Sequence, residues 1–314
     1  MRKIIVDISN LLHASYIGTF MSSKNNSIPD DIKAMTVKEY VLRKILIQIK
    51  RFDVSKEDVI LAMDFGSWRK DHFPHYKHKR RASQDDDFRR KMIDFFNDFE
   101  SEILANLPWK TIKIGGVEGD DIIGVLTRRF QEEGATTFIL SRDHDFLQLV
   151  DENTKIIDPF NGNLIACYNF YKEKDGTHFS WDVDNKKDAK KFLLFHILLG
   201  DPGDGIPSVV LDDDHYTSSK KGKRFGVKTI LNTFFSDNEE KNVTNLKKCH
   251  HENQKNFYRN MLLIDLNNIP FSIRDKINST YNEEMSYDFQ AFENWCASNN
   301  LYDILKQFEQ VNHV

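Results

Sequence analysis

Four short apolar runs, each about five residues long and rich in β-branched side chains, constrain the fold of this chain most. They lie at residues 3–7, 59–64, 111–114 and 136–141. Segments with helical spacing follow, for example residues 32–50 after the first run and residues 120–131 after the third. Continuous apolar strands that alternate with helices are typical of a parallel sheet covered on both faces. We therefore predict an α/β fold with a central, mostly parallel sheet flanked by helices.

The second part of the chain has a different pattern, because the strand signal fades after about residue 190. Helical spacing predicts helices at residues 191–199, 228–235, 256–266 and 289–305. Residues 160–190 are polar and irregular and are interpreted as a connector. A length of 314 residues allows about two domains. We expect an α/β core at residues 1–190 and a smaller α-helical domain at residues 191–314.

Composition excludes several classes of protein. No run approaches the roughly 18 apolar residues of a membrane span. The first strand begins at residue 3, so we expect no signal peptide. Cys167, Cys249 and Cys296 form no Cys-x-x-Cys pair and cannot all pair with one another. A disulfide scaffold or a cysteine-bound zinc is therefore not expected. We expect a reducing, cytoplasmic location.

The placement of charge is more informative than its sum. The net charge of −4, from 44 basic and 48 acidic residues, argues against a nucleic-acid partner unless the signs are segregated. Residues 69–91 contain nine Lys or Arg against four Asp, with aromatic residues nearby. A second basic cluster comprises Lys220, Lys221, Lys223, Arg224 and Lys228. Such cations and aromatics suit a single-stranded or frayed nucleic acid, although solvated surface runs remain the alternative.

Acidic residues form five groupings, several of them at or just past the ends of predicted strands. They are Asp7, Asp64, Glu118 with Asp120 and Asp121, Asp143 with Asp145, and Asp201 with Asp204. Ligands of parallel sheets gather at the carboxyl ends of the strands, so we expect these side chains to converge. Converging carboxylates repel one another unless cations neutralise them, and their oxygens suit Mg²⁺ or Mn²⁺. Two such ions about 4 Å apart support phosphodiester hydrolysis.

Each acidic grouping also has a plainer interpretation. An Asp after a strand is usually a turn former or a helix cap. Glu118 and Asp120 could simply complement the dipole at a helix N-terminus, and the segment 201–205 could be only a tight turn. The coincidence of all five groupings favours the metal site.

The motifs resemble those of the structure-specific 5′ nuclease (flap endonuclease) superfamily, and most of all the RNase H-type 5′-to-3′ exonucleases of tailed phages. Val-Glu-Gly-Asp-Asp at 117–121, Ser-Arg-Asp-His-Asp-Phe at 141–146 and Gly-Asp-Pro-Gly-Asp-Gly-Ile-Pro at 200–207 follow the family's order. Tyr-Lys-His-Lys-Arg at 76–80 fits the family's Tyr-Lys-x-x-Arg in the arch that encloses a 5′ end. Here the arch would span about residues 66–105.

The resemblance implies a hydrolase with two Mg²⁺ ions, for which Mn²⁺ substitutes. It would remove RNA primers from RNA–DNA hybrids and trim 5′ ends or flaps of duplex DNA during replication. The ligands of the tighter ion would be Asp7, Asp64, Glu118, Asp120 and Asp143. The second ion would be held, largely through water, by Asp121, Asp145, Asp201 and Asp204.

The same resemblance implies roles at the substrate. Asp120 and Asp143 would be catalytic carboxylates, Lys77 would stabilise charge on the attacked phosphate, and Tyr76 would stack on the terminal base. The expected contacts to the phosphate backbone are Arg69, Lys79, Arg80 and Arg81, together with the second basic cluster.

Two departures from the family pattern stand out. Gly205 and Ser208 replace the usual Asn and Gly of Gly-Asp-x-x-Asp-Asn-Ile-Pro-Gly. The duplex-binding Gly-x-Gly-x-Lys-Thr lacks its first glycine at residues 224–229 and follows a polar insertion at residues 211–223. A potassium-assisted grip on the duplex is therefore not carried over, and Lys220–Arg224 would replace it electrostatically.

Two alternatives stay open. A PIN-type ribonuclease shares the sheet and several carboxylates, but it usually lacks the basic arch and the helical Gly-Asp-x-x-Asp segment. A protein that grips forked DNA without cutting it would show a degraded acidic site, whereas all nine acidic positions are present. The expected partners are RNA–DNA hybrid, forked and flap DNA, and replication proteins such as a single-strand-binding protein or sliding clamp. We expect no membrane partner, and a monomer.

Overall fold

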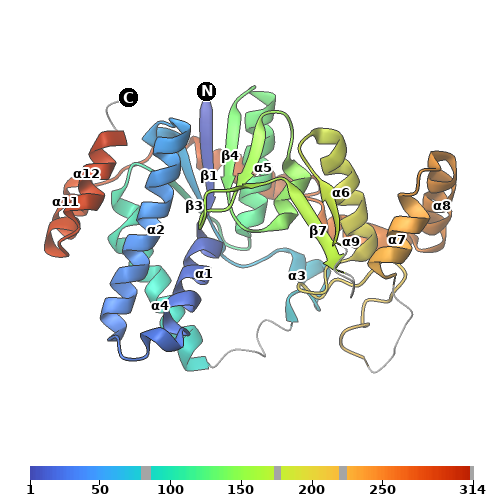
Figure 1. The fold of residues 1–314 in the computed structure, drawn as a ribbon, viewed down its shortest axis with the longest axis horizontal. Coiled ribbons are helices and arrows are strands. Elements are labelled where there is room, and N and C mark those ends of the chain that lie inside the picture. The colour runs from blue at the N-terminus through green and yellow to red at the C-terminus, as the bar shows by residue number, and fades with distance from the viewer. Residues whose placement is uncertain (79–85, 173–177, 219–224, 312–314) are drawn as a thin grey trace.

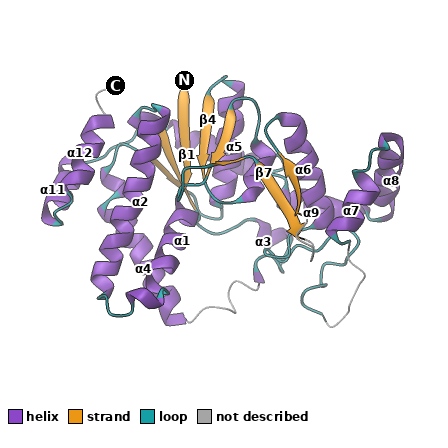
Figure 2. Cartoon of the chain, viewed as in Figure 1, coloured by secondary structure: helices purple, strands orange, loops and turns teal. Residues whose placement is uncertain are grey.

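A mostly parallel sheet with helices on both faces forms the centre of the computed structural model, which describes residues 1–78, 86–172, 178–218 and 225–311 (Figure 1, Figure 2). The strand order is β3-β2-β1-β4-β5-β6, in which β6 alone among these strands is antiparallel to its neighbour. The strands are β1 Arg2–Asp7, β2 Val59–Met63, β3 Lys110–Lys113, β4 Thr136–Leu140, β5 Thr154–Ile157 and β6 Leu164–Ile165. This confirms the predicted fold class.

The strands are apolar throughout because both faces of the sheet are covered. In β1, Ile4 and Val6 point into one hydrophobic cluster, whereas Ile5 points into the other. The neighbouring strand β2 is buried at every position. Alternate residues of one strand thus stabilise two separate helix layers.

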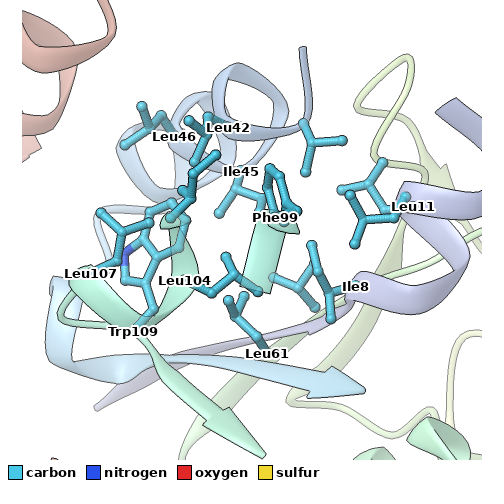
Figure 3. Close-up of a cluster of buried hydrophobic side chains, with 14 of the residues drawn as sticks. Ile8, Leu11, Leu42, Ile45, Leu46, Leu61, Phe99, Leu104, Leu107 and Trp109 are labelled. Carbon is cyan, nitrogen blue, oxygen red and sulfur yellow. The ribbon is translucent and has the colours of Figure 1, made fainter. Parts of the chain in front are cut away.

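The first layer contains helices from both ends of the chain. It consists of α1 Ile8–Phe20, α2 Asp30–Phe52, α4 Asp86–Glu102, α11 Phe289–Ser298 and α12 Tyr302–Val311. Figure 3 shows Leu46 of α2 and Phe99 of α4 above Leu61 of β2. Each such fully buried side chain contributes about 1.5–3 kcal/mol relative to an exposed one. Because α4 belongs to this layer, the second half of the predicted arch region is anchored to the core.

The second layer covers the opposite face of the sheet. It consists of α5 Gly119–Glu132, the 3₁₀ helix η5 His144–Leu149 and α10 Phe271–Asn282. Ile122 and Leu126 of α5 lie one turn apart and are fully buried against the sheet. This packing fixes the N-terminus of α5 at the carboxyl edge of the strands.

A separate cluster of helices follows the sheet. It consists of α6 Lys186–Leu199, α7 Val227–Phe234, α8 Glu239–Glu252 and α9 Gln254–Ile264. Phe195, Ile230 and Phe257 are buried together in its own core. After α9 the chain returns to the sheet, where α10 contacts α5 and β3, and α12 contacts α2. The domain boundary at residue 190 stays a prediction.

Several local predictions were wrong. The interpreted connector at residues 160–190 contains β6 and a separate hairpin, β7 Cys167–Lys172 with β8 His178–Asp182. The helix predicted at 289–305 is two helices, because Asn300 adopts a left-handed φ of 58° between them. The strand β5 and the helices α8 and α10 were not predicted. The short α3, Arg69–His72, begins the basic region.

Two further observations concern membrane-spanning helices and cysteines. No described helix is both long and apolar enough to cross a membrane. Cys167, Cys249 and Cys296 are all free thiols, and the last two are buried.

Candidate active site

The carboxyl edge of the sheet brings together acidic residues that are up to 136 positions apart in the sequence. Asp7 is the last residue of β1, Asp64 directly follows β2, and Asp143 follows β4. Asp120 lies in the first turn of α5, after β3. Because β1 to β4 are parallel, all four positions lie at the same edge. We call Asp7, Asp64, Asp120 and Asp143 the edge carboxylates.

Local hydrogen bonds hold the edge carboxylates in place. One oxygen of Asp7 accepts from the backbone N–H of Asn10 at 3.1 Å, which caps α1, and the other accepts from Ser141 Oγ at 2.9 Å. Ser141 Oγ also accepts from the backbone N–H of Asp143 at 3.0 Å. Asp64 Oδ1 accepts from the N–H of Gly119 at 2.6 Å. These bonds join the ends of β1, β2 and β4 to the start of α5.

Ser141 was missed as a site residue by sequence reasoning. Its position at the head of the motif at residues 141–146 was the available signal, but only the fold shows that its hydroxyl connects Asp7 with Asp143.

Burial and neighbouring carboxylates raise the pKa of two edge carboxylates, Asp7 and Asp120. Burial, followed by the charge of Asp64, raises the pKa of Asp7 to about 7. Burial likewise raises the pKa of Asp120 well above its ordinary value, and Asp143 and Asp7 add to the rise while Lys77 opposes it. Among the described residues, no ion pair involves an edge carboxylate. Within the described ranges, their negative charge is therefore open to neutralisation by an external cation.

Glu118 and Asp121 lie in the same helical turn as Asp120, yet their surroundings differ. Glu118 accepts from Arg69 at 2.9 Å, from Ser67 Oγ at 2.7 Å and from Lys77. Burial by itself raises the pKa of Glu118, but Lys77 and Arg69 outweigh it and hold the pKa below its ordinary value. We call Glu118 and Asp121 the compensated pair.

Asp121 is fully buried, and both of its carboxylate oxygens are engaged. One oxygen pairs with Arg69 at 2.8 Å, and the other accepts from the Trp68 indole at 3.0 Å and from the backbone N–H of Glu118 at 3.1 Å. The last bond completes a capping box at the start of α5. The structure thus places Asp121 in a helix cap and in an ion pair with Arg69.

A second acidic group, Asp145, Asp201 and Asp204, lies beside the edge carboxylates. Burial raises the pKa of Asp145 well above its ordinary value, and the charges of Asp143, Asp201 and Asp204 add to it. Asp145 and Asp201 line one small pocket together with Asp204 and Asp120. A histidine also contacts this group: His196 Nδ1 of α6 lies 3.5 Å from Asp145 Oδ1.

Lys77 lies between Glu118 and Asp204. Its ammonium pairs with Glu118 and lies 3.5 Å from Asp204 Oδ2, and its backbone N–H donates to the carbonyl of Asp204 at 2.7 Å. The backbone of Lys77 is left-handed, with a φ of 54°. The structure places Lys77 between Glu118 and Asp204, and its catalytic role stays a prediction.

Whether these residues fit divalent ions is decided by their chemistry. No three described His, Cys, Asp or Glu side chains are close enough to enclose one ion. However, the groups present only carboxylate oxygens on one edge, with raised pKa values at Asp7, Asp120 and Asp145. Mg²⁺ prefers such oxygens and keeps several of its own waters, so it needs few direct protein ligands. The donor set fits hydrated divalent ions.

Two residues predicted to contact the substrate are buried in the protein. Arg69 is 2% exposed and donates to the carbonyl of Leu263 as well as to the compensated pair. Tyr76 is 4% exposed, donates to Glu118 at 3.1 Å and packs with Phe73 and Ile206. Neither presents a free face, so the phosphate contact of Arg69 and the base stacking of Tyr76 do not fit this structure.

Most of the other predicted nucleic-acid contacts lie outside the described residues. These are Lys79, Arg80, Arg81, Lys220, Lys221, Lys223 and Arg224. Lys228 is described, and it is exposed in the first turn of α7.

Gly205, one of the departures from the family pattern, has a structural reason. Its φ is +78°, a region that disfavours side chains, and a Cβ there would lie 2.9 Å from the carbonyl of His75. The loop carrying Asp201 and Asp204 thus fits closely against the turn that presents Lys77.

Fold and site together indicate a phosphoester hydrolase, and comparison with known proteins identifies the family. The family model described as "5'-3' exonuclease, N-terminal resolvase-like domain" matches residues 2–178, and that described as "T4 RNase H, C terminal" matches residues 188–308. The chain belongs to the 5′-3′ exonuclease family. It is a nuclease of the 5′-3′ exonuclease and flap endonuclease type, a phosphodiester hydrolase.

Named relatives agree with this assignment. The 5′-3′ exonuclease of Buchnera aphidicola subsp. Acyrthosiphon pisum is 31% identical over 81% of this chain and 78% of its own length. The Ribonuclease H of Enterobacteria phage T4 is 27% identical over 87% of this chain and 85% of its own length.

Solved structures share the fold. The bacteriophage T5 5′-exonuclease with bound zinc has a TM-score of 0.59 at 18% identity, over 90% of this chain and 98% of that chain. A T5 flap endonuclease in complex with DNA and metal ions has a TM-score of 0.55 at 16% identity, over 98% of this chain and 100% of that chain.

Proposed function

We propose that this nuclease is Mg²⁺-dependent and removes RNA primers from RNA–DNA hybrids and trims 5′ ends or flaps of duplex DNA during replication. The observation that carries the proposal is the set of edge carboxylates, which share one sheet edge and form no ion pair with any residue that the structure describes. The names of the phage T4 Ribonuclease H and of the DNA-bound T5 flap endonuclease support the substrate classes. Mn²⁺ would substitute for Mg²⁺.

We assign the residues near the metal ions according to their contacts. Asp7, Asp64, Asp120 and Asp143 would hold the first ion, and Asp145, Asp201 and Asp204 would hold the second, largely through water. We give Glu118 and Asp121 no direct metal contact, because Lys77, Arg69 and Trp68 already engage their oxygens. When bound, the ions would supply an activated water and stabilise the leaving oxygen.

The chain's own residues would orient the reacting groups. The hydrogen bonds from Ser141 and Gly119 hold Asp7 and Asp64 in fixed directions, so little reorganisation is needed when the substrate arrives. Lys77 would place its ammonium beside the attacked phosphate, since it already lies between Glu118 and Asp204. Lys228 and the basic residues outside the described ranges would neutralise backbone phosphates.

Cleavage assays test the proposal. A 5′-labelled RNA–DNA hybrid and a 5′-flap DNA are each incubated with Mg²⁺ and with chelator, and Asp120→Asn serves as the contamination control. Metal-dependent release of short 5′ products by the wild type alone is the expected result. Tight fork binding without cleavage would favour the non-cleaving alternative, and cleavage of free single-stranded RNA alone would favour a PIN-type ribonuclease.

Partner proteins and location are part of the same proposal. A nuclease acting on replication intermediates would work in the cytoplasm of the cell that copies the DNA. A single-strand-binding protein or a sliding clamp would be its expected partner, and pull-down with either protein tests this.

A further inference from the structure

Arg259 and Asn260 are neighbouring buried residues of α9. Although they lie more than 50 positions after Asp204, both donate hydrogen bonds to the loop that carries Asp201 and Asp204. Arg259 is 9% exposed and Asn260 is fully buried. The loop runs from Gly200, at the end of α6, through Asp201 and Asp204 to residue 213. We call residues 200–213 the acidic loop.

Arg259 donates to several points of the acidic loop at once. Its guanidinium bonds the carbonyl of Pro207 at 2.9 Å, that of Ser208 at 3.3 Å and that of Leu211 at 3.1 Å. It also bonds Asp213 Oδ1 at 2.8 Å. A planar fork with five donors can satisfy carbonyls on two sides of a turn, which a lysine ammonium cannot do in one plane.

Asn260 completes the arrangement from the adjacent position. Its Nδ2 donates to the carbonyl of Pro207 at 2.9 Å and to the carbonyl of Ile197 in α6 at 2.8 Å. Its Oδ1 accepts from Arg259 Nε at 2.9 Å, so the amide also orients the guanidinium. The two side chains thus join α9, α6 and the acidic loop.

The loop itself is closed tightly, so its position depends on these anchors. Ile206 donates its N–H to the carbonyl of Asp201 at 2.7 Å, and a Cβ on Gly200 would lie 2.5 Å from the carbonyls of Ile206 and Pro207. Pro207 therefore sits directly against the turn that carries Asp201. A displacement of Pro207 would be transmitted to that carboxylate and, through the Asp204 carbonyl, to the backbone of Lys77.

From these contacts we infer that Arg259 and Asn260 are positioning residues for the second metal ion of the proposed function. They touch no reacting atom, and they act by fixing the backbone from which Asp201 and Asp204 project. Residues that orient metal ligands from behind typically affect metal affinity 10- to 100-fold when they are replaced. The inference rests on the proposed function, because it requires that Asp201 and Asp204 bind metal.

Metal binding is the direct test, measured by Mn²⁺ titration with electron paramagnetic resonance and without substrate. We expect wild type to bind two ions, and Arg259→Met to bind the second about tenfold more weakly while the first is unchanged. Arg259→Lys, which keeps the charge and part of the bonding, should lie between the two. The Mg²⁺ concentration for half-maximal cleavage should shift in the same order.

Two controls separate positioning from general loss of stability. Lys255→Ala removes an exposed lysine of the same helix, whose ammonium pairs with Asp213, and should leave metal affinity unchanged. Leu46→Ala opens a cavity in the opposite helix layer and should lower the melting temperature without changing either metal affinity. If Arg259→Met does not fold, the metal affinities of Arg259→Lys and Leu46→Ala are compared instead, and weaker binding of the second ion by Arg259→Lys alone supports the inference.

The possible outcomes are distinct. Wild-type affinity for both ions in a folded Arg259→Met, or in Arg259→Lys where Arg259→Met does not fold, would overturn the inference and leave the proposed function intact. Failure of the wild type to bind two ions would overturn the proposed function itself, and the inference with it. Equal weakening of both ions would also overturn the inference, because it would indicate a general effect.

Discussion

Asp120 and Asp121 are adjacent in the first turn of the same helix, and burial raises the pKa of both, yet of the two only Asp121 forms an ion pair with a described residue. Asp121 is fully buried and is paired with Arg69 and Trp68. Asp120 is half-buried and faces Asp143 and Asp7, whose charges add to the rise that burial causes in its pKa. Glu118 differs from the edge carboxylates in the same way, because Arg69 and Lys77 pair with it. Where the chain supplies the countercharge, a carboxylate stabilises the fold; where it does not, the carboxylate is available to an external cation.

The largest effect should come from Asp120→Asn. Removing one edge carboxylate should lower the cleavage rate at least about a thousandfold, equivalent to about 4 kcal/mol, while substrate affinity and stability stay the same or rise. The stability gain follows from the loss of like-charge repulsion. Cleavage of 5′-labelled substrates and thermal unfolding measure the two effects. Cleavage at near wild-type rate would contradict the assignment of Asp120 as a metal ligand.

Asp121→Asn should have the opposite signature. It leaves Arg69 buried with only Glu118 as a charged partner, so the free energy of unfolding should fall by about 3 kcal/mol. Urea unfolding measures this value, with Asp120→Asn as the matched control one residue away. An equally stable Asp121→Asn protein that has lost all cleavage would place Asp121 among the metal ligands after all.

Lys77→Ala tests the lysine whose ammonium lies between Glu118 and Asp204. Because the ammonium approaches both Glu118 and Asp204, its removal should slow single-turnover cleavage about a hundredfold. One cation among many adds little affinity, so the dissociation constant should change less than about threefold. Lys113→Ala, which removes a lysine paired with Glu100, is the control and should cleave normally. A change confined to the dissociation constant would make Lys77 only a backbone contact.

The last prediction concerns the pH dependence of stability. The folded-state pKa of Asp7 is raised from 3.8 to about 7, so the folded state holds a proton that the unfolded state has released. In chelator, this group should therefore lower stability progressively as pH rises from about 4 to about 7. Asp7→Asn keeps the cap of α1 and should flatten that slope in urea unfolding at pH 5 and pH 8. Added Mg²⁺ should stabilise the wild type most at the higher pH; an unaltered slope in Asp7→Asn would contradict the assignment.

Much of the fold could be read from local patterns. The apolar runs at residues 3–7 and 59–64 predicted buried strands, because a strand covered on both faces needs apolar residues at consecutive positions. The strand β5, Thr154–Ile157, was missed because only its last two residues are apolar. The helix break at Asn300 was missed because a left-handed residue leaves no mark on the spacing of apolar residues.

The strand ends and the acidic residue types beside them follow from the amino-acid sequence. The tertiary structure alone decided which carboxylates are neutralised, since Arg69 lies 49 positions from Glu118 and no helical spacing connects the two. It also buried Tyr76, which the motif alone placed against the substrate. The physical reason is that charge compensation and burial depend on distances through space, whereas spacing along the chain reports only which face of one element a residue occupies.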